Sequence, residues 1–310
     1  MYISNVLVSI LAAASTAQAF QFSDVKEAAS SAAVEARTLL SALFDRQSAC
    51  PAVWKEISTT LTAQFLGDNE CTDAARAAIR AAFHDCFNGA CDGSLILANE
   101  CSNNENRGLE RLCGNLGNLA QEKKVGVADL IQFAAAHAIK TCPGGPTVPV
   151  KVGRKDSSTA NPTGVLPSPQ QSAGDLIKLF ASKGFSPVDL AALVGAHTAS
   201  KQRFVDPATA GAALDSTVGK WDNKFYSETI NGRAPFTLQS DKALADNLVT
   251  GIPFKSFALS QSLWSIAFVP AMQKMSMMGV SGSGLIDCTS ALPGGSRKRD
   301  IKSSNVWDRV

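Results

Sequence analysis

Residues 73–94 constrain the fold of this chain more than any other stretch. The first part, residues 73–83, is rich in Ala and Arg and contains no Gly or Pro, a composition that favours an α-helix. On such a helix Arg80 and His84 lie four residues apart on one face, so a neutral imidazole lies beside a permanent cation. The stretch therefore predicts a helix that carries a general base next to a group that stabilises an anion.

The loop after this helix is rich in oxygen ligands for a hard cation. Asp85, Asp92 and Ser94 offer carboxylate and hydroxyl oxygens, to which a Gly-containing loop can add carbonyl oxygens. A second helical segment ends at His197 and also runs into a loop with spaced oxygen donors. These donors are Thr198, Asp215, Thr217 and Asp222. Two histidines, each followed by such a loop, predict two calcium sites that each fix a His-bearing helix.

Two such helices can hold a haem between them. A haem iron needs an axial imidazole on one face, and peroxide chemistry needs a base and a cation on the other. Arg80 and His84 form a pair of the second kind, which leaves His197 as the axial ligand. The third histidine, His137, lies on an apolar helix with no acid or Arg at helical spacing, so we expect a satisfied core or surface residue and not a ligand.

Composition narrows the class of protein. The chain has 310 residues and a formal net charge of +2, which gives no electrostatic reason to expect nucleic-acid binding. Ala is very common and aromatic residues make up 7%, which favours helices over a β-sandwich. Eight cysteines fit an oxidising compartment and four disulfides, although their number alone leaves the pairing open. We expect an all-α protein.

The order of the chain predicts four segments. Residues 1–19 read as a signal peptide with an A-x-A cleavage pattern, which indicates a secreted, extracellular protein. Residues 20–49 are a propeptide or an N-terminal helical segment, residues 50–288 the main domain, and residues 289–310 a polar C-terminal tail. Within the main domain, residues 256–279 have the pattern of an amphipathic helix broken near its proline. No later apolar run is long enough to cross a bilayer.

The two His-bearing segments carry specific motifs. They read Arg80-x-x-Phe83-His84-Asp85 with Asp92-x-Ser94, and Leu193-Val194-Gly195-Ala196-His197-Thr198. The first resembles the distal signature of the plant-type haem peroxidases, and the second resembles their proximal signature. The layout from Cys50 to Cys288 is most similar to the secreted fungal, or class II, members. The resemblance implies the plant-type haem peroxidase fold, with haem b between a distal and a proximal helical half and little β-structure.

The resemblance also implies roles for distal residues. His84 would act on hydrogen peroxide as general base and then acid. Arg80 would stabilise the charge that develops as the O–O bond breaks. Asn106 would hold the other ring nitrogen of His84 as N–H, and Glu100 matches the Glu that supports this network. Phe83 would pack over the haem edge.

On the proximal side, the resemblance makes His197 the iron ligand and Asp241 the acceptor of its hydrogen bond, which raises the basicity of the ligand. The implied ligands of the first calcium ion are Asp85, Asn88, Ala90, Asp92 and Ser94. Those of the second are Thr198, Asp215, Thr217, Lys220 and Asp222. The implied disulfides are Cys50–Cys288, Cys71–Cys142, Cys86–Cys91 and Cys101–Cys113.

Departures from the family pattern bear on the electron donor. Where manganese peroxidases carry an acidic cluster, this chain has Asp73, Ala77 and Arg203, a set that cannot hold Mn2+ well. Where lignin and versatile peroxidases use a surface Trp, it has Ala192. The resemblance therefore implies hydrogen peroxide and small phenolic or dye donors as partners, with one-electron oxidation at the haem edge. We expect a monomer that binds neither nucleic acid nor membrane.

Other functions stay open at this point. A manganese- or lignin-type peroxidase with a non-standard donor site is one, and a catalytically weak, secreted haem-binding protein is another. The complete set of Arg80, His84 and Asn106 argues against an inactive protein. A zinc hydrolase that uses the three histidines is disfavoured, because no His-x-His or His-x-x-x-His spacing occurs.

Overall fold

A computed structural model describes residues 49–294. The predicted signal peptide, residues 1–19, lies outside the described residues, as does nearly all of the predicted segment 20–49. The chain divides into two units, Met1–Ala49 and Cys50–Val310. The second unit contains every helix and strand that the structure describes.

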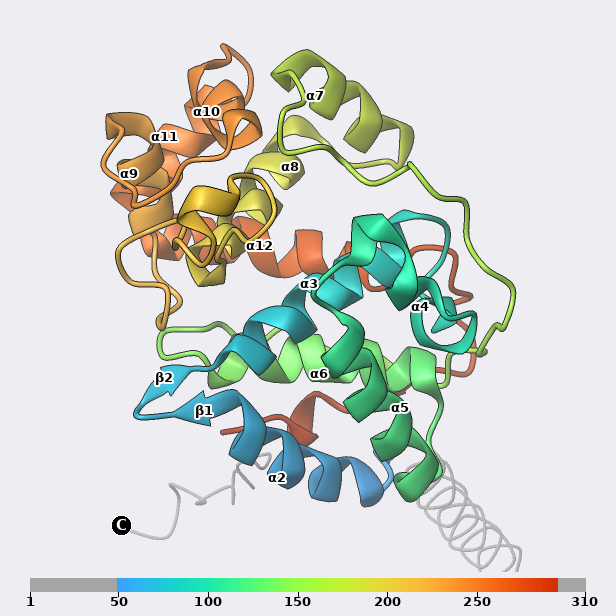
Figure 1. Ribbon diagram of the computed structural model, residues 1–310. Helices are drawn as coiled ribbons and strands as arrows, with labels where there is room; N and C mark the ends of the chain where they lie inside the picture. Colours follow the sequence, from blue (N-terminus) through green and yellow to red (C-terminus); the bar gives the residue numbers. More distant parts are fainter. Residues whose placement is uncertain (1–48, 295–310) are drawn as a thin grey trace, which may run out of the picture. The chain divides into compact units, whose positions relative to one another are not determined.

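The described unit is built mainly from α-helices, which confirms the predicted all-α class (Figure 1). Its earlier helices are α2 (Val53–Phe65), α3 (Asp73–Phe87), α4 (Ser94–Leu97), α5 (Glu110–Lys123) and α6 (Val127–Thr141). Its later helices are α7 (Ala173–Ser182), α8 (Pro187–Val194), α9 (Lys224–Asn231), α10 (Gln239–Asp246), α11 (Gly251–Leu259) and α12 (Gln261–Met275). In Figure 1, α2, α5 and α6 lie together on one side of α3, and α9, α10 and α11 lie together on the other.

Short elements join the helices. Two antiparallel pairs of two-residue strands are formed by β1 (Leu66–Gly67) with β2 (Glu70–Cys71), and by β3 (Lys151–Val152) with β4 (Ile286–Asp287). The 3-10 turns are η1 (Glu100–Ser102), η2 (Asn104–Asn106), η3 (Gly195–Ala199), η4 (Pro207–Thr209) and η5 (Thr289–Ala291). Within residues 49–294, no helix is long and apolar enough to cross a membrane.

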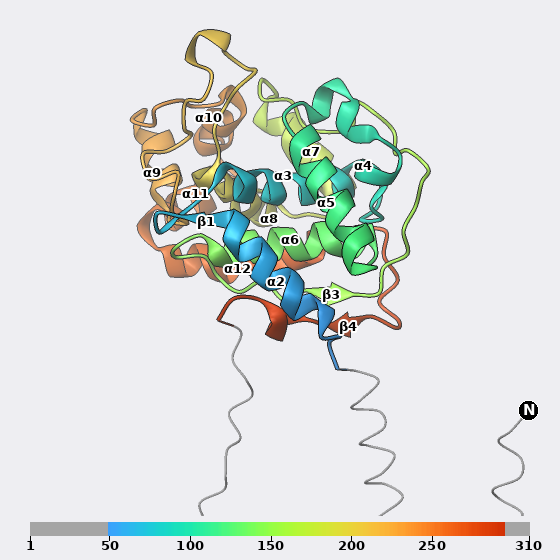
Figure 2. The same ribbon diagram turned by 60° about the horizontal axis from the view of Figure 1, so that its bottom comes forward.

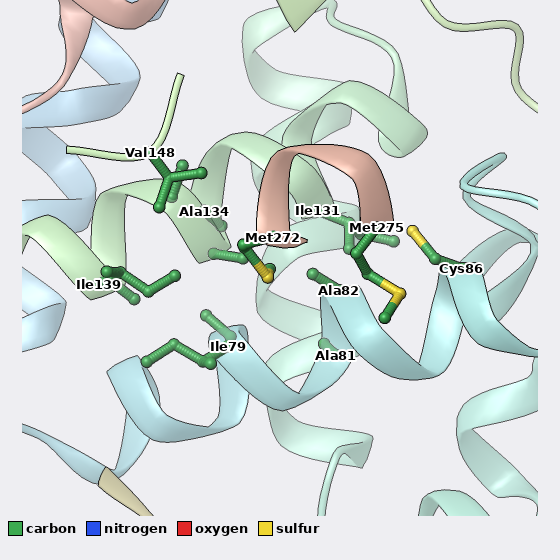
Figure 3. Packing of buried hydrophobic residues seen from close by; sticks show 14 of the residues in the cluster. Ile79, Ala81, Ala82, Cys86, Ile131, Ala134, Ile139, Val148, Met272 and Met275 are labelled. Carbon is green, nitrogen blue, oxygen red and sulfur yellow. The ribbon is translucent and has the colours of Figure 1, made fainter. Parts of the chain in front are cut away.

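Helix α3 forms where the composition predicts it and packs closely on α6. The hydroxyl of Thr72 caps its first turn by accepting a hydrogen bond from the Ala75 backbone N–H, at 3.3 Å. Small side chains fill the buried face of α3, which allows α6 to approach closely. Figure 3 shows this core, in which Met272 and Met275 from α12 cover residues of α3 and α6. The labelled residues of α3 and α6 are Ile79, Ala81, Ala82, Cys86, Ile131, Ala134 and Ile139.

Four disulfides cross-link the unit. They join Cys50 to Cys288, Cys71 to Cys142, Cys86 to Cys91 and Cys101 to Cys113, the four pairs that the resemblance implies. The first ties the residues before α2 to those after β4, which lie side by side in Figure 2. The third closes the loop that follows α3.

The break in the predicted helix 256–279 lies elsewhere than expected. Helix α11 ends at Leu259, and Ser260 separates it from α12 in an extended conformation, with φ −151° and ψ 110°. The hydroxyl of Ser260 then caps α12 by accepting a hydrogen bond from Leu263 N–H at 3.2 Å. Pro270 lies inside α12 instead of ending it. The N-cap serine, a strong helix-start signal, determines the boundary here, and the proline does not.

The packed structure also continues past Cys288, where the sequence predicts a polar tail. The hydroxyl of Thr289 accepts a hydrogen bond from the Val150 backbone N–H at 3.0 Å. Leu292 is 1% exposed, and Ala291 is also buried. Ala291 and Leu292 therefore belong to the core of the unit, and the Thr289 hydroxyl ties the preceding turn to the Val150 backbone.

Candidate active site

Arg80 and His84 form one hydrogen-bonded pair on α3. Arg80 Nε donates to His84 Nε2 at 3.1 Å, as the spacing of four residues on a helix predicts. Two further guanidinium nitrogens of Arg80 donate to the backbone carbonyls of Arg107 and Glu105, at 2.8 and 3.0 Å. The segment after η1 therefore fixes the orientation of the guanidinium beside the imidazole.

Asn106 holds the other ring nitrogen of His84. The distance from His84 Nδ1 to Asn106 Oδ1 is 2.6 Å, and Asn106 Nδ2 donates to the Glu100 carbonyl at 2.8 Å. Because the amide oxygen can only accept, Nδ1 carries the proton and Nε2 keeps its lone pair. Glu100 thus supports this network through its backbone, while its carboxylate accepts from the Asn161 N–H at 2.8 Å.

The surroundings keep this imidazole neutral. Burial, with the nearby charge of Arg80, lowers the pKa of His84 to about 3, against the opposing effect of the hydrogen bond to Asn106. Burial also lowers the pKa of Arg80, to about 10, which leaves the guanidinium charged at neutral pH. A neutral base therefore lies beside a cation, the arrangement that general-base chemistry on a weak acid requires.

His197 lies in η3, directly after α8, and faces Asp241 on α10. Its Nδ1 lies 3.1 and 3.0 Å from the two carboxylate oxygens of Asp241, a side chain that is 1% exposed. Burial opposes the charge on His197, but the charge and hydrogen bond of Asp241 outweigh it and raise the pKa of His197. With Nδ1–H given to the carboxylate, Nε2 is free to bind a metal.

Gly195 in the proximal motif has a steric explanation. A Cβ at this position would clash with the hydroxyl of Tyr226 and lie 2.6 Å from the indole of Trp264. Both rings are fully buried. The Tyr226 hydroxyl donates a hydrogen bond to the Ala191 carbonyl, and the Trp264 indole N–H donates one to the Ala192 carbonyl. Glycine therefore allows the turn that carries His197 to pack directly on these two aromatic residues.

Arg80 and His197 line one cleft of about 820 Å³. Its wall includes apolar side chains from several elements, namely Leu109, Leu112, Leu214 and Leu238, and Pro169 also lines it. This size lies in the range of small-molecule and cofactor sites. Phe83, predicted to pack over a cofactor edge, is absent from the lining and stacks on Phe87, with ring centroids 4.8 Å apart.

The first loop predicted to bind calcium is assembled around Asp85. This buried carboxylate accepts hydrogen bonds from the backbone N–H groups of Gly93 and Leu95, both at 3.2 Å. Burial raises its pKa to about 7, as expected for a carboxylate taken out of water. Asn88 Oδ1 is buried and has no hydrogen-bond partner among the described residues. The loop therefore offers oxygens that suit a hard cation.

The second loop has the same character. Thr198 donates from its hydroxyl to Asp215 at 2.6 Å, and the Thr217 N–H donates to the other oxygen of this carboxylate at 2.9 Å. Burial raises the pKa of Asp215 to about 6. The Thr217 hydroxyl is buried without a partner in the described part of the chain. Residues 49–294 contain no metal-site cluster of three or more His, Cys, Asp or Glu, so each loop would have to add hydroxyl, amide or carbonyl oxygens to its carboxylates to hold a cation.

Comparison with known proteins decides the family. The model of the peroxidase family matches residues 53–260, about two thirds of the chain. This chain belongs to the peroxidase family. It is 31% identical over 260 residues to the low-redox potential peroxidase of Taiwanofungus camphoratus, with 77% of each chain covered. It is 30% identical over 263 residues to manganese peroxidase 3 of Phlebia radiata, and the aligned region covers 74% of this chain and 73% of that protein.

These similarities confirm the predicted family and fold. The peroxidase of Arthromyces ramosus adds a further fungal relative, 28% identical over 274 residues, with 78% of this chain covered. Family membership makes this protein a peroxidase, an oxidoreductase, and implies a haem cofactor. The residues present fit that cofactor, because a histidine with a free Nε2 and the Arg80 guanidinium face one cleft of suitable size.

Cations surround Asp73, one of the positions from which the sequence predicts the electron donor. The Asp73 carboxylate is contacted by three cations, Arg76 at 2.9 Å, Arg203 at 3.1 Å and Lys201 at 3.4 Å. Its charge is therefore compensated by these three side chains, which disfavours the binding of a further cation to this carboxylate. Ala192, the other position from which the sequence predicts the donor, is fully buried.

Sequence reasoning missed three contributors to the site. Asn161 donates from Nδ2 to the Ser94 hydroxyl at 2.8 Å, and the carbonyl of Arg107 anchors Arg80. Phe204 lines the cleft and is 47% exposed. No pattern identified them, since each acts through a backbone atom or from an irregular loop.

Proposed function

We propose that this peroxidase reduces hydrogen peroxide to water with haem b and oxidises small phenolic or dye donors in one-electron steps at the haem edge. One observation carries the proposal: Arg80, which is hydrogen-bonded to His84, and His197, which is hydrogen-bonded to Asp241, line the same cleft, and His84 is in turn held by Asn106. His197 would hold the haem through its Nε2, and the bound haem would supply the electron transfer between peroxide and donor.

The distal side chains move the protons. His84 Nε2, kept unprotonated by burial and by Arg80, accepts a proton from hydrogen peroxide. The same nitrogen then returns it to the departing oxygen, which leaves as water. Arg80 donates hydrogen bonds to the charge that develops on the separating oxygens, and the carbonyls of Glu105 and Arg107 hold it in place for this.

The test is the replacement of the base, His84→Ala. The rate constant for the peroxide-dependent change in the Soret band should fall by about 10²–10⁴-fold, because only the proton transfer is lost. The resting Soret band and haem content should stay, since haem is held on the His197 side. His137→Gln, a change of a buried histidine remote from the cleft lining, is the matched control. An unchanged rate in His84→Ala would refute the assignment.

The proposal extends to calcium and to location. Two calcium ions would bind, one to Asp85, Asn88, Ala90, Asp92 and Ser94, and the other to Thr198, Asp215, Thr217, Lys220 and Asp222. In each loop, a buried oxygen without a partner among the described residues supports this. The protein would act outside the cell as a monomer, a location that four disulfides support. Mass measurement of the protein from culture medium gives the mature N-terminus.

A further inference from the structure

The mouth of the cleft carries more positive charge than the reaction at its base requires. Six cations line it: Arg76, Arg80, Arg107, Arg111, Lys201 and Arg203. Among the described lining residues, Asp73 is the one acid, and Glu110 lies beside them with its carboxylate 2.8 Å from the Gly108 N–H. Even if the two propionates of haem b take two of these charges, two positive charges remain unmatched.

The six cations differ in how they are used. Arg76 donates to the carbonyls of Cys71 and Val218, at 2.7 and 2.9 Å, and Arg80 is fixed beside His84. Arg107 and Arg111 are exposed and form no ion pair with a described residue. The side chain of Arg203 is 53% exposed and contacts Asp73 at one edge only. The guanidinium groups of Arg107, Arg111 and Arg203 are therefore accessible to an anion from solvent.

An aromatic ring lies among these guanidinium groups. Phe204 is 47% exposed, and the Arg107 guanidinium lies 4.6 Å from its ring centroid. The neighbouring Val205 is also exposed, at 38%. Gly108 lets the ring lie against the backbone, since a Cβ there would be 3.3 Å from it. An exposed apolar surface beside paired cations suits a ligand that has both an aromatic ring and an anionic group.

We propose that Arg107, Arg111, Arg203 and Phe204, here termed the basic mouth, bind aromatic donors that carry a carboxylate or sulfonate. Phe204 packs against the donor ring, and the guanidinium groups bind the anion. The inference rests on the proposed peroxidase function and names the donor class of that site. The same positive charge surrounds Asp73, so we also expect the basic mouth to disfavour Mn2+.

A matched donor pair tests the proposal in the holoenzyme. We compare 4-hydroxy-3-methoxycinnamic acid, ionised near neutral pH, with its methyl ester, which has the same phenol but no charge. The ratio of kcat/KM for acid over ester should be about 10 at low ionic strength, since exposed ion pairs each change affinity by a few-fold. It should fall toward one at about 300 mM salt, where charges are screened beyond a few ångströms.

Variants locate the effect. Arg111→Gln and Arg203→Gln should each reduce the acid-to-ester ratio by about 2- to 5-fold through KM, because each removes one exposed charge. Phe204→Ala should raise KM for both donors, since both lose the ring contact. Lys55→Gln, an exposed lysine on α2 that is absent from the cleft lining, is the control and should leave the ratio unchanged.

Binding without turnover separates this inference from the proposed function. Equilibrium dialysis of both donors against holoenzyme, without peroxide, should show tighter binding of the acid in the wild type and less in Arg203→Gln. Equal binding of acid and ester, with no effect of salt, overturns the proposal even if both are oxidised. If the enzyme binds the acid more tightly than the ester but oxidises neither, the binding role of the basic mouth is supported and the proposed peroxidase function is refuted.

Discussion

Two buried histidines of this chain show how hydrogen-bond partners assign a role. His84 faces a guanidinium donor at Nε2 and an amide oxygen at Nδ1, so its proton lies on Nδ1 and its Nε2 is a base. His137 Nε2 lies 2.9 Å from the Ser58 carbonyl, so that nitrogen carries the proton, and its Nδ1 lies 3.1 Å from the Thr141 hydroxyl. Both nitrogens of His137 are thus satisfied by the core, as the sequence predicts for this residue.

His137 makes the stability of the fold depend on pH. Burial lowers its pKa to about 4, against the hydrogen bond to Ser58, whereas the unfolded chain keeps about 6.5. Between these values the unfolded state binds a proton that the native state does not, so stability is lost as pH falls through this window. The free energy of unfolding should lose up to about 3 kcal/mol from this residue by pH 4.

The variant His137→Gln isolates this contribution from those of other titrating groups. Urea unfolding of both proteins between pH 4 and pH 7 gives the difference in free energy at each pH. The wild type should be the more stable at pH 7, and its advantage should shrink as pH falls below about 6.5. A difference that stays constant over this range would show that His137 does not titrate on unfolding.

At the scale of elements, each of the two histidines assigned to the reaction, His84 and His197, is followed by a segment with buried oxygen atoms. Asp85 follows His84 at the end of α3, and Thr198 follows His197 in η3. Asp85 and Asp215 each accept two hydrogen bonds, which link the segment that carries each histidine to the loop that follows it. A cation bound in either loop would therefore position a histidine that it does not touch.

Removal of calcium is expected to affect both faces of the cofactor. Incubation with EDTA should shift the Soret band and lower activity with a neutral phenol, and added Ca2+ should restore both, because each loop fixes one histidine. Elemental analysis should give two calcium ions per chain. Thr217→Val, which removes the buried hydroxyl of the second loop, should make that loss easier. Indifference of spectrum and activity to EDTA, with no calcium found, would reject both sites.

Parts of the site that lie close in sequence could be predicted from it, and parts on distant loops could not. The pair of Arg80 and His84 follows from helical spacing alone. The contact of His197 with Asp241 spans 44 residues, so only the family resemblance indicated it. Asn161 and Phe204 lie in irregular segments whose path depends on the packing of the whole unit, and no periodic pattern marks them. The basic mouth could not be predicted either, because its residues come together only when segments distant in sequence pack against one another.

At the scale of the whole unit, disulfides hold together segments that are distant in sequence. The bridge from Cys50 to Cys288 spans 238 residues and joins the two ends of the described helical core. The bridge from Cys86 to Cys91 spans 5 residues and acts within one loop. In the chain-entropy account, a cross-link stabilises by restricting the unfolded chain, and the effect grows with the logarithm of the loop length. The two bridges should therefore contribute unequally.

Paired replacement of cysteines by serine measures this difference. In this account, loss of the bridge between Cys50 and Cys288 should lower the free energy of unfolding by about 5.5 kcal/mol, and loss of that between Cys86 and Cys91 by about 2 kcal/mol. Urea unfolding in excess EDTA gives both values without any contribution from metal binding. Equal losses would mean that native contacts near each bridge, rather than the unfolded chain, determine its contribution. The longer bridge also bears on function. Neither Cys50 nor Cys288 belongs to the cleft lining. Loss of this bridge should therefore lower stability and leave the acid-to-ester ratio of the folded enzyme unchanged.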